Sequence, residues 1–343
     1  MRAVLLVPGP LDTVSGGYGY DRQMLAELTA AGHDASAVAL AGVHPQPDAA
    51  ARAAAQAAWA ALPAGAVPVI DGLGLPAFAD LAAEFGARGA VGLIHHPTSL
   101  EDGLAEADRA ALDASEQALF RQLPRVVVTS VATAETLEHR FGVDPARINV
   151  VVPGTAPAAR CGGSGGPGCA LLTVGSLIPR KGHAVLLRAL ARLFDLDWRL
   201  TVAGGPLDGA TGRALQAQAA ELGIADRVRF IGTVTDEALE ALWRGTDIFA
   251  LATRYEGYGM AIAEALARGL PVAITEGGAA GRLVTPEAGA ICEVDDMVTL
   301  SKALRRMIFD TELRAAMADA AWTLGRSLPD WPTQGAAFAA ALA

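Results

Sequence analysis

Short apolar strands alternate with alanine-rich helical segments along most of the chain, and this alternation constrains the fold more than any other feature. The strand-like runs are "AVLLV", "ASAVAL", "VPVID", "AVGLIHH" and "RVVVTS" in the first half, and "ALLTVGS", "WRLTVAGG", "RVRFIG", "DIFALAT" and "PVAIT" in the second. Strands that alternate with helices form a parallel sheet with helices on both faces. The sequence therefore predicts an α/β protein built on parallel sheets.

A stretch rich in glycine and proline separates the two halves. The segment "TAPAARCGGSGGPGCA" lacks a periodic apolar pattern and is typical of a flexible linker. We therefore predict two Rossmann-like, doubly wound domains, residues 1–155 and 170–327, joined by a linker over residues 156–169. Ligands of such sheets bind at the carboxyl ends of the strands, so the two domains are expected to face each other across a cleft.

The end of the chain predicts one more helix. The helical pattern runs to about Ser327 and is then interrupted by Pro329 and Pro332. Proline breaks or kinks a helix because it lacks an amide hydrogen and its ring clashes with the preceding turn. A separate helix over about residues 328–343 is therefore expected, and it can pack back on the N-terminal domain.

Composition narrows the classes of partner. A net charge of -10 disfavours a nucleic-acid partner, which requires an excess of Lys and Arg. Cys161, Cys169 and Cys292 match neither a disulfide framework nor a zinc site. No apolar run approaches the roughly 18 residues of a membrane span, and the first one, ended by Pro8, is too short for a signal peptide. We expect a cytoplasmic protein without a transmembrane segment, which is compatible with peripheral membrane contact.

Two glutamates mark the first candidate site. In "RYEGYGMAIAEALARG", Glu256 lies in the loop after a strand, and Glu264 lies between one and two turns into a helix that begins near Gly259. The backbone amides from Gly257 to Met260 are at the positive end of the helix dipole, where they suit an oxygen-rich ligand. The alternative is that Glu264 is an exposed helix residue and the glycines are ordinary turn residues.

Two adjacent cations mark the second candidate site. In "LLTVGSLIPRKGHAVLLRAL", a strand is followed by a loop with Gly175, Arg180 and Lys181, and then by a helix from about His183. A diphosphate needs both positive charge and close backbone approach, and the carboxyl end of a strand can offer both. The alternative is a solvated loop.

The N-terminal half offers weaker signals. Gly16 and Gly17 come just before a helix of about 13 residues, where their amides can approach a phosphate or a sugar, although their spacing is not that of a dinucleotide fingerprint. His95 and His96 follow a strand, and either can contact a sugar or donate a hydrogen bond. Side chains alternate along a strand, so we expect one histidine to be buried and the other exposed, and at most one to be functional.

Together these motifs resemble the retaining glycosyltransferases of family four, which have the GT-B architecture. "GSLIPRKG" and "EGYGMAIAEALARGLPV" carry the resemblance, and "SGGYGYDRQMLAELTAAGHD", "VAGG", "RVRFIGTV" and "DIFALAT" follow the family's order, so that it covers nearly every residue from 3 to about 295. The resemblance implies an acceptor-side N-terminal domain and a nucleotide-sugar-binding C-terminal domain.

The resemblance also implies roles for individual residues. Glu256 would bind hydroxyls of the transferred sugar, and Glu264 would bind the ribose. Arg180 and Lys181 would bind the diphosphate, with Arg180 supplying the charge that many members place at the position of Ser176. The predicted catalytic residues are Glu256, Lys181, Arg180, His95 and His96, and the predicted nucleotide-sugar-binding residues are Gly16, Gly17, Gly175, Ser176, Arg180, Lys181, Gly204, Val234, Glu256, Gly257, Tyr258, Gly259, Met260 and Glu264.

The activity implied is a retaining hexosyl transfer from a nucleotide-diphosphate sugar to an acceptor hydroxyl by same-face displacement, without metal or other cofactor. The acceptor would be a sugar, a lipid-linked sugar or a small molecule. The D-x-D at Asp195 to Asp197 precedes a strand and is expected to be a solvated loop, away from the site. A sugar-nucleotide 2-epimerase, a pyridoxal-phosphate-dependent phosphorylase and a non-catalytic nucleotide-sugar-binding protein remain as alternatives.

Overall fold

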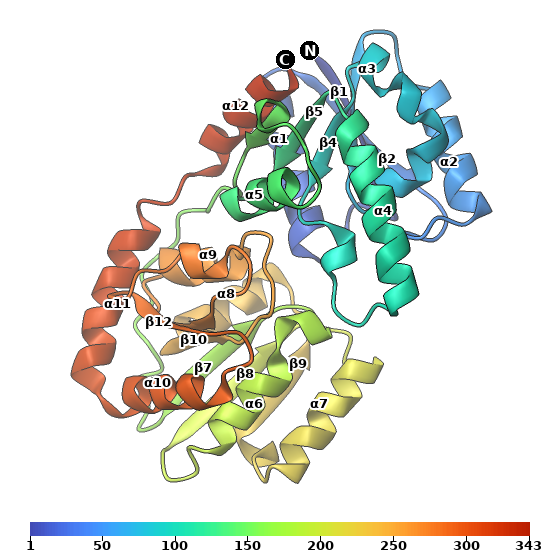
Figure 1. Cartoon of the computed structure of the whole chain (residues 1–343). Helices are drawn as coiled ribbons and strands as arrows, with labels where there is room; N and C mark the ends of the chain where they lie inside the picture. The colour runs from blue at the N-terminus through green and yellow to red at the C-terminus, as the bar shows by residue number, and fades with distance from the viewer. The chain divides into compact units, whose positions relative to one another are not determined.

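Two six-stranded parallel sheets form the framework of the protein (Figure 1). The computed structural model describes residues 1–343, which divide into two units. Unit 1 contains residues Met1–Gly154 and Pro329–Ala343, and unit 2 contains residues Thr155–Leu328. The last segment of the chain therefore belongs to the unit that the first segment builds.

The sheet of unit 1 has the strand order β2-β1-β3-β4-β5-β6, and every neighbouring pair is parallel. Its strands are β1 (Arg2–Pro8), β2 (Asp34–Leu40), β3 (Ala66–Asp71), β4 (Val91–Ile94), β5 (Arg125–Val128) and β6 (Ile148–Val150). Its helices are α1 (Gly16–Ala30), α2 (Ala49–Ala60), α3 (Phe85–Arg88), α4 (Glu106–Gln122), α5 (Val131–His139) and α12 (Trp331–Leu342), with short 3-10 helices η1 (Leu75–Glu84), η2 (Thr98–Leu100) and η3 (Pro145–Arg147).

The sheet of unit 2 has the strand order β12-β11-β10-β7-β8-β9, again with parallel neighbours. Its strands are β7 (Cys169–Val174), β8 (Trp198–Ala203), β9 (Val228–Gly232), β10 (Ile248–Leu251), β11 (Val272–Thr275) and β12 (Gly289–Cys292). Its helices are α6 (His183–Ala191), α7 (Ala210–Glu221), α8 (Asp236–Arg244), α9 (Met260–Ala267), α10 (Met297–Phe309) and α11 (Thr311–Gly325), with η4 (Pro179–Lys181), η5 (Ala225–Arg227) and η6 (Ala280–Arg282).

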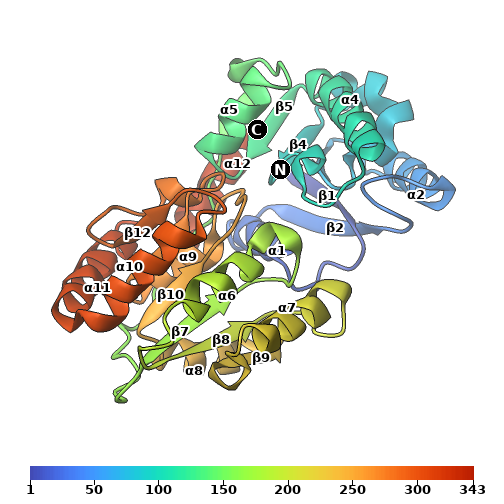
Figure 2. The ribbon, with the colours of Figure 1, turned by 60° about the horizontal axis from the view of Figure 1, so that its bottom comes forward.

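Helices cover both faces of each sheet, as the second view also shows (Figure 2). In unit 1, Leu5 and Val7 of β1 pack on one face with α1 and α12, while Val4 and Leu6 pack on the other face with α2 and η1. The alternate burial of neighbouring residues follows from the two-residue repeat of a strand. Both sheets are therefore doubly wound, and each has a core on either face.

The strand order of each unit reverses direction once. In unit 1 the reversal lies between β1 and β3, and in unit 2 it lies between β7 and β10. Loops that follow the two strands at such a switch point diverge to opposite faces of the sheet and leave a crevice at their carboxyl ends. These two places are therefore where the topology favours a binding site.

The segment between the two sheets contains no helix or strand from residue 151 to residue 168. Part of it is nevertheless held against unit 2. The amide of Cys161 donates to the carbonyl of Arg268 at 2.9 Å, and the amide of Ser164 donates to the carboxylate of Asp247 at 3.0 Å.

The first helix begins earlier than the sequence indicated. Gly16 and Gly17 were expected to precede it, but they are its first two residues, and Ser15 is its N-cap. The Ser15 hydroxyl accepts a hydrogen bond from the Tyr18 amide, the interaction that makes serine a favourable N-cap. That capping bond extends the helix over the two glycines despite their low helix propensity.

The C-terminal helix α12 packs against α1. Phe338 is 3% exposed and lies against the ring of Tyr20 with a centroid separation of 6.3 Å. Gly335 contacts α1 as well, since a Cβ there would lie 2.3 Å from the Cβ of Glu27. Helix α12 is thus part of the core of unit 1.

Phe338→Ala should lower the free energy of unfolding of unit 1 by about 3–5 kcal/mol, because it leaves a cavity between α12 and α1. Phe309→Ala is the matched control, since Phe309 is 77% exposed, and it should change stability by no more than about 0.5 kcal/mol. Urea unfolding followed by circular dichroism measures both. Equal effects of the two substitutions would show that α12 is not part of the core.

Candidate functional site

Lys181 and Glu256 form an ion pair at the switch point of unit 2. Lys181 ends η4, in the loop that follows β7, and Glu256 lies in the loop that follows β10, the strand beside it. The ammonium Nζ lies 2.8 Å from Oε1 and 2.9 Å from Oε2 of the carboxylate. Their side chains are only 16% and 8% exposed, so water screens the pair little.

Arg180 joins the same two loops through the backbone. Its Nη1 donates to the carbonyl of Tyr255 at 2.7 Å, and its own carbonyl accepts from the amide of Arg254 at 2.8 Å. The amide of Glu256 donates to the carbonyl of Gly277 at 3.1 Å, which ties the loop to the segment after β11 as well. The position of the Glu256 carboxylate is therefore fixed from both sides.

Gly204 allows the loops after β7 and β8 to touch. A Cβ at this residue would lie 1.9 Å from the carbonyl oxygen of Gly175, and its φ of +149° is one that other residues rarely adopt. The Gly204 amide donates to the carbonyl of Gly232 at 2.8 Å, so the loop after β9 joins the same edge.

The sequence-predicted residues of unit 2 thus lie at one edge of its sheet. They follow β7 (Gly175, Ser176, Arg180, Lys181), β8 (Gly204), β9 (Val234) and β10 (Glu256, Gly257, Tyr258, Gly259, Met260, Glu264). Helix α9 begins at Met260, and its first hydrogen bonds are donated by Ile262 and Ala263 to the carbonyl of Gly259. The amides before Ile262 are therefore those that an α-helix leaves without an internal partner.

The two glutamates stand in opposite electrostatic environments. Burial opposes the ionisation of Glu256, but Lys181 and Arg180 outweigh it and hold the pKa of this carboxyl below its ordinary value. Burial raises the pKa of Glu264 to about 7, and Asp236 and Glu240 add to the rise while Arg268 opposes it. Glu256 is consequently a fixed anion, whereas Glu264 exchanges its proton near neutral pH.

Tyr258, one of the predicted binding residues, offers little accessible surface. Its side chain is mostly buried, with 8% exposed, and burial raises the pKa of its hydroxyl to about 12. Only a small part of this residue is therefore available to a ligand.

His183 supports the loop that carries Arg180 and Lys181, and the sequence analysis assigned it no role beyond the start of a helix. Burial lowers the pKa of His183 to about 4, against the opposing effect of the Ser176 carbonyl. The neutral ring lies with Nε2 3.3 Å from that carbonyl, so the Nε2–H donates to Ser176. The histidine thereby holds the backbone of the loop that carries Lys181. A single histidine at the start of a helix carries no sequence signal for such a role.

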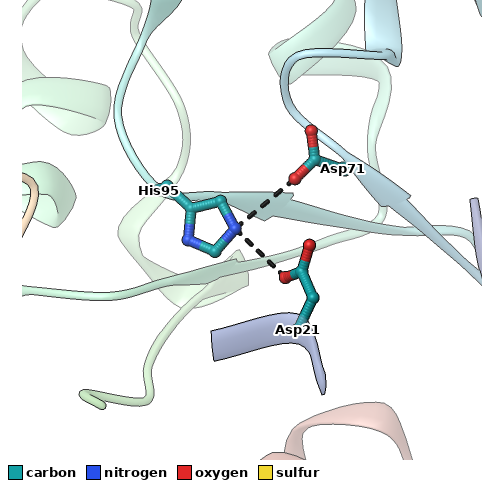
Figure 3. Close-up of side chains that lie close together, drawn as sticks. All are labelled: Asp21, Asp71 and His95. Atoms are coloured by element: carbon teal, nitrogen blue, oxygen red, sulfur yellow. Dashed lines mark hydrogen bonds and ion pairs between the residues drawn. The ribbon is translucent and has the colours of Figure 1, made fainter. Parts of the chain in front are cut away.

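A second cluster lies at the switch point of unit 1. His95 follows β4, Asp71 ends β3, and Asp21 lies in α1, and the three side chains point toward one another (Figure 3). The His95 Nε2 lies 3.1 Å from Oδ1 of Asp21 and 3.4 Å from Oδ2 of Asp71. The sequence analysis missed both aspartates. The sequence did carry a signal for Asp71, because this residue ends the strand "VPVID" and His95 directly follows another strand.

The two histidines do not divide into one buried and one exposed residue. Their side chains are 20% and 19% exposed, so that expectation is wrong. Strand β4 ends at Ile94, and both histidines follow it, where the alternation of a strand no longer applies. His96 instead pairs with Glu101, with Nε2 2.5 Å from Oε1.

Gly17 lies beside the His95 ring, where the absence of a side chain allows the close approach. A Cβ on Gly17 would lie 3.2 Å from Cδ2 of the His95 ring. Gly16, one residue earlier, is exposed at the first position of α1. The two glycines therefore differ in their surroundings, and the second is packed against the histidine.

The potential metal ligands are few. Asp21, Asp71 and His95 are a group whose ligand atoms lie within 4.8 Å of one another. The separations between Nε2 and the two carboxylates are those of hydrogen bonds, which a proton on Nε2 satisfies. Asp195 of the D-x-D lies in the loop before β8 and pairs with Arg305 at 2.6 Å on the exposed surface of unit 2. Lys181 and Glu256 instead lie in loops that follow strands.

Residues 168–323 match the family model described as "Glycosyl transferases group 1". Among curated proteins, the D-inositol 3-phosphate glycosyltransferase of Salinispora tropica is 32% identical over 228 residues, which cover 59% of this chain and 47% of the relative. That of Corynebacterium urealyticum is 30% identical over 258 residues, covering 65% and 61%. The chain spans about half the length of the curated relatives it matches.

Solved structures match over nearly the full chain. A sucrose-phosphate synthase from Thermosynechococcus elongatus has a TM-score of 0.83 at 18% identity and covers 99% of this chain and 98% of its own. HepE from Anabaena, solved with UDP-glucose, has a TM-score of 0.78 at 18% identity, with 99% of each chain covered. These matches confirm the GT-B architecture predicted from the sequence. None of the helices combines the length and the apolar character needed to cross a bilayer.

Lys181→Met should lower the free energy of unfolding of unit 2 by about 3–5 kcal/mol, because it leaves the buried Glu256 carboxylate without its cation. The matched control is Lys302→Met, since Lys302 is the other lysine of the chain and is exposed. Its effect should stay within about 0.5 kcal/mol. Urea unfolding at neutral pH measures both.

The difference between wild type and Lys181→Met should depend on pH. The pKa of Glu256 is lower in the folded protein than its ordinary 4.5, so the pair stabilises the fold above that pH and loses this contribution as the pH falls through the folded value. The stability difference should therefore be full at neutral pH and shrink in acid. A difference that stayed constant down to about pH 2 would contradict an ionised Glu256.

Proposed function

We propose, from the premise that the chain belongs to the glycosyl transferases group 1 family, that it moves a sugar from a nucleotide-diphosphate donor to an acceptor hydroxyl with retention of configuration. The observation that carries the proposal is the Lys181–Glu256 pair at the switch point of unit 2, within the segment that matches the family model. Such an edge places a fixed cation and a fixed anion beside the amides of a helix N-terminus.

The donor in this proposal is a UDP-sugar. HepE from Anabaena, whose fold this chain shares, was solved with UDP, with UDP and glucose, and with UDP-glucose. In unit 2 the cations Arg180 and Lys181 suit the diphosphate, because they lie beside the backbone amides that precede α9. Glu264, which exchanges its proton near neutral pH, suits hydroxyl groups such as those of ribose, since a carboxyl can accept and donate hydrogen bonds.

Glu256 has a different proposed task. It is anionic and held in place by Lys181, so it accepts hydrogen bonds from hydroxyls of the transferred sugar. Lys181 in turn can contact the departing diphosphate while it remains beside Glu256. Stabilisation of the charge that develops on the leaving group would then supply most of the rate acceleration. The acceptor hydroxyl attacks from the face that the diphosphate leaves, and a phosphate oxygen takes its proton.

Metal independence is part of the proposal. Two cationic side chains at the unit 2 edge can neutralise a diphosphate without a divalent ion, and Asp195 is committed to its surface pair with Arg305. The acceptor hydroxyl belongs to a sugar, a lipid-linked sugar or a small molecule.

A thermal-shift panel tests the donor. UDP, ADP and GDP are added at equal concentration, followed by UDP-sugars. UDP at about 100 times its dissociation constant should stabilise the fold by about 2.7 kcal/mol, and the variant Glu264→Gln should reduce this shift. A larger shift with ADP or GDP would contradict the proposed base, and no shift with any of them would contradict nucleotide binding.

Glu256→Gln and Lys181→Ala should each lower turnover by roughly 100-fold or more, on the scale of losing one preorganised transition-state contact. Both are assayed by UDP release at a temperature at which circular dichroism shows the variants folded. Asp195→Asn is the control with unchanged turnover, since Asp195 is a surface residue. Turnover close to wild type in both site variants would contradict the assignment.

Activity should persist in excess chelator. Loss of activity with EDTA and its recovery with magnesium or manganese would contradict the metal-independent reading, while the turnover defects of the variants would still identify the site.

A further inference from the structure

His95 is held by two carboxylates at a single ring nitrogen. Asp21 from α1 and Asp71 from the end of β3 both face Nε2, and their side chains are 0% and 7% exposed (Figure 3). A carboxylate without a proton only accepts hydrogen bonds, so Nε2 must carry the hydrogen that the two share. Two ionised carboxylates at one ring nitrogen thus assign the proton to Nε2.

The rest of the histidine is held equally firmly. Its backbone carbonyl accepts from the hydroxyls of Thr129 at 3.2 Å and Thr133 at 3.4 Å. The ring meets the ring of Tyr20 edge to face, with a centroid separation of 5.5 Å. A Cβ placed on Gly17 would lie only 3.2 Å from the His95 ring. Four elements of unit 1 thus hold the imidazole in one orientation.

The second ring nitrogen is left for a ligand. Nδ1 points away from both carboxylates (Figure 3). It accepts or donates no hydrogen bond within the protein, and it is not among the buried polar atoms that lack a partner, so it is accessible. With Nε2 already protonated, Nδ1 is a basic lone pair if the ring is neutral and an N–H donor if the ring is charged.

The charges around the ring decide between these two states. Burial opposes the charged form, but Asp21 and Asp71 outweigh it and raise the pKa of His95 to about 10. Burial raises the pKa of Asp21 itself to about 6, and His95 opposes that rise. Arg22 also lowers the pKa of Asp21.

The tyrosines beside the cluster stay neutral. Burial, followed by Asp71 and Asp21, raises the pKa of Tyr18 to about 12. Burial, followed by Asp21, raises the pKa of Tyr20 well above its usual range. The two carboxylates that face Nε2 therefore favour an imidazolium between them. One oxygen of Asp21, Oδ2, is buried without a hydrogen-bond partner, so the contact of Oδ1 with His95 is the side-chain hydrogen bond that stabilises this carboxylate.

We propose that Asp21 and Asp71 are positioning residues that fix His95 as an imidazolium, so that an Nδ1–H donor and not a basic lone pair faces the ligand at the carboxyl edge of the unit 1 sheet. The role of that ligand as substrate rests on the proposed glycosyl transfer, but the state of His95 does not. His95 then donates a hydrogen bond to an oxygen that becomes more negative during the reaction. It does not remove the proton of the acceptor hydroxyl.

Nitrogen-15 NMR of the full chain labelled at histidine tests the state of His95 directly. The chain has six histidines, and His95→Gln identifies the signal. In the wild type, both His95 nitrogens should stay protonated through about pH 8, whereas an ordinary histidine titrates near pH 6.5. In Asp21→Asn/Asp71→Asn, His95 should lose the Nδ1 proton between about pH 6 and 8.

The control for this spectrum is Glu101→Gln, which removes the carboxylate beside His96 and should leave the His95 signal unchanged. Titration of wild-type His95 near pH 6.5 would overturn the proposal, as would an unprotonated Nε2. If the double variant does not fold, the wild-type titration and the single variant Asp71→Asn still decide the question.

The pH dependence of turnover supplies a second readout. Asp21→Asn/Asp71→Asn should retain kcat in mild acid and lose roughly 100-fold of it by about pH 8, with the KM for donor little changed. Asp71→Asn alone should lose less, because Asp21 still faces Nε2. Asp71→Glu keeps the charge and should keep the wild-type pH dependence. A loss of kcat equal at every pH would show a merely structural role and overturn the proposal. If no transferase activity exists, the proposed function fails while the NMR result stands on its own.

Zinc and manganese titrations of the chelator-treated protein address the competing occupant. No stoichiometric binding is expected, because the proton already occupies Nε2. Tight binding of either ion that shifts the His95 signal and disappears in Asp21→Asn/Asp71→Asn would overturn the proposal in favour of a metal site.

Discussion

The parallel alignment of the strands is the constraint on which both sites depend. A crossover between parallel strands returns the chain to the same edge, so every loop after a strand lies at the carboxyl ends of all of them. Lys181 and Glu256 are 75 residues apart in sequence, yet they meet because β7 and β10 are neighbours at the switch point. His95 and Asp71 meet at the corresponding edge of unit 1 for the same reason.

Each unit stabilises a charged group by pairing it with charge of the opposite sign, and the signs are reversed between the units. In unit 2 one cation holds a buried anion, and in unit 1 two buried anions hold a partly buried cation. In each case the partners outweigh burial, which alone would neutralise the group. Glu264 and His183 lack so close a partner of opposite charge, and burial moves both toward the neutral form. The groups that stay charged are therefore those that face a side chain of opposite charge from another element of the same unit.

The sequence was sufficient for the architecture because strand alternation and the loop motifs are local signals. It was also sufficient to place Lys181 and Glu256 at strand ends, although their contact needed the strand order of the sheet. It was insufficient for Asp21, because this residue lies within a helix and no local pattern around it indicates a contact with His95. It misled for His95 and His96, since the strand ends at Ile94, two residues before the end of the strand-like run "AVGLIHH".

Helix α12 shows why residues from the end of the chain belong to the first unit. Tyr20, whose ring contacts His95, also contacts Trp331 and Phe338 of α12, and its hydroxyl donates to the carbonyl of Val151 at 3.0 Å. Removing α12 would expose the outer side of Tyr20 and leave its ring free to reorient.

At each of the two places where the chain passes between the units, a residue close to the boundary contacts Tyr20. Val151 comes three residues before the boundary at Gly154, and Trp331 comes two residues after the boundary at Pro329. Gly154 and Trp331 are themselves packed so closely that a Cβ on the glycine would lie 2.5 Å from the Trp331 backbone. Dense packing of this kind transmits a displacement, because neighbouring side chains have no free volume to absorb it. A change of backbone at either boundary would therefore act on Tyr20, and through Tyr20 on the orientation of His95.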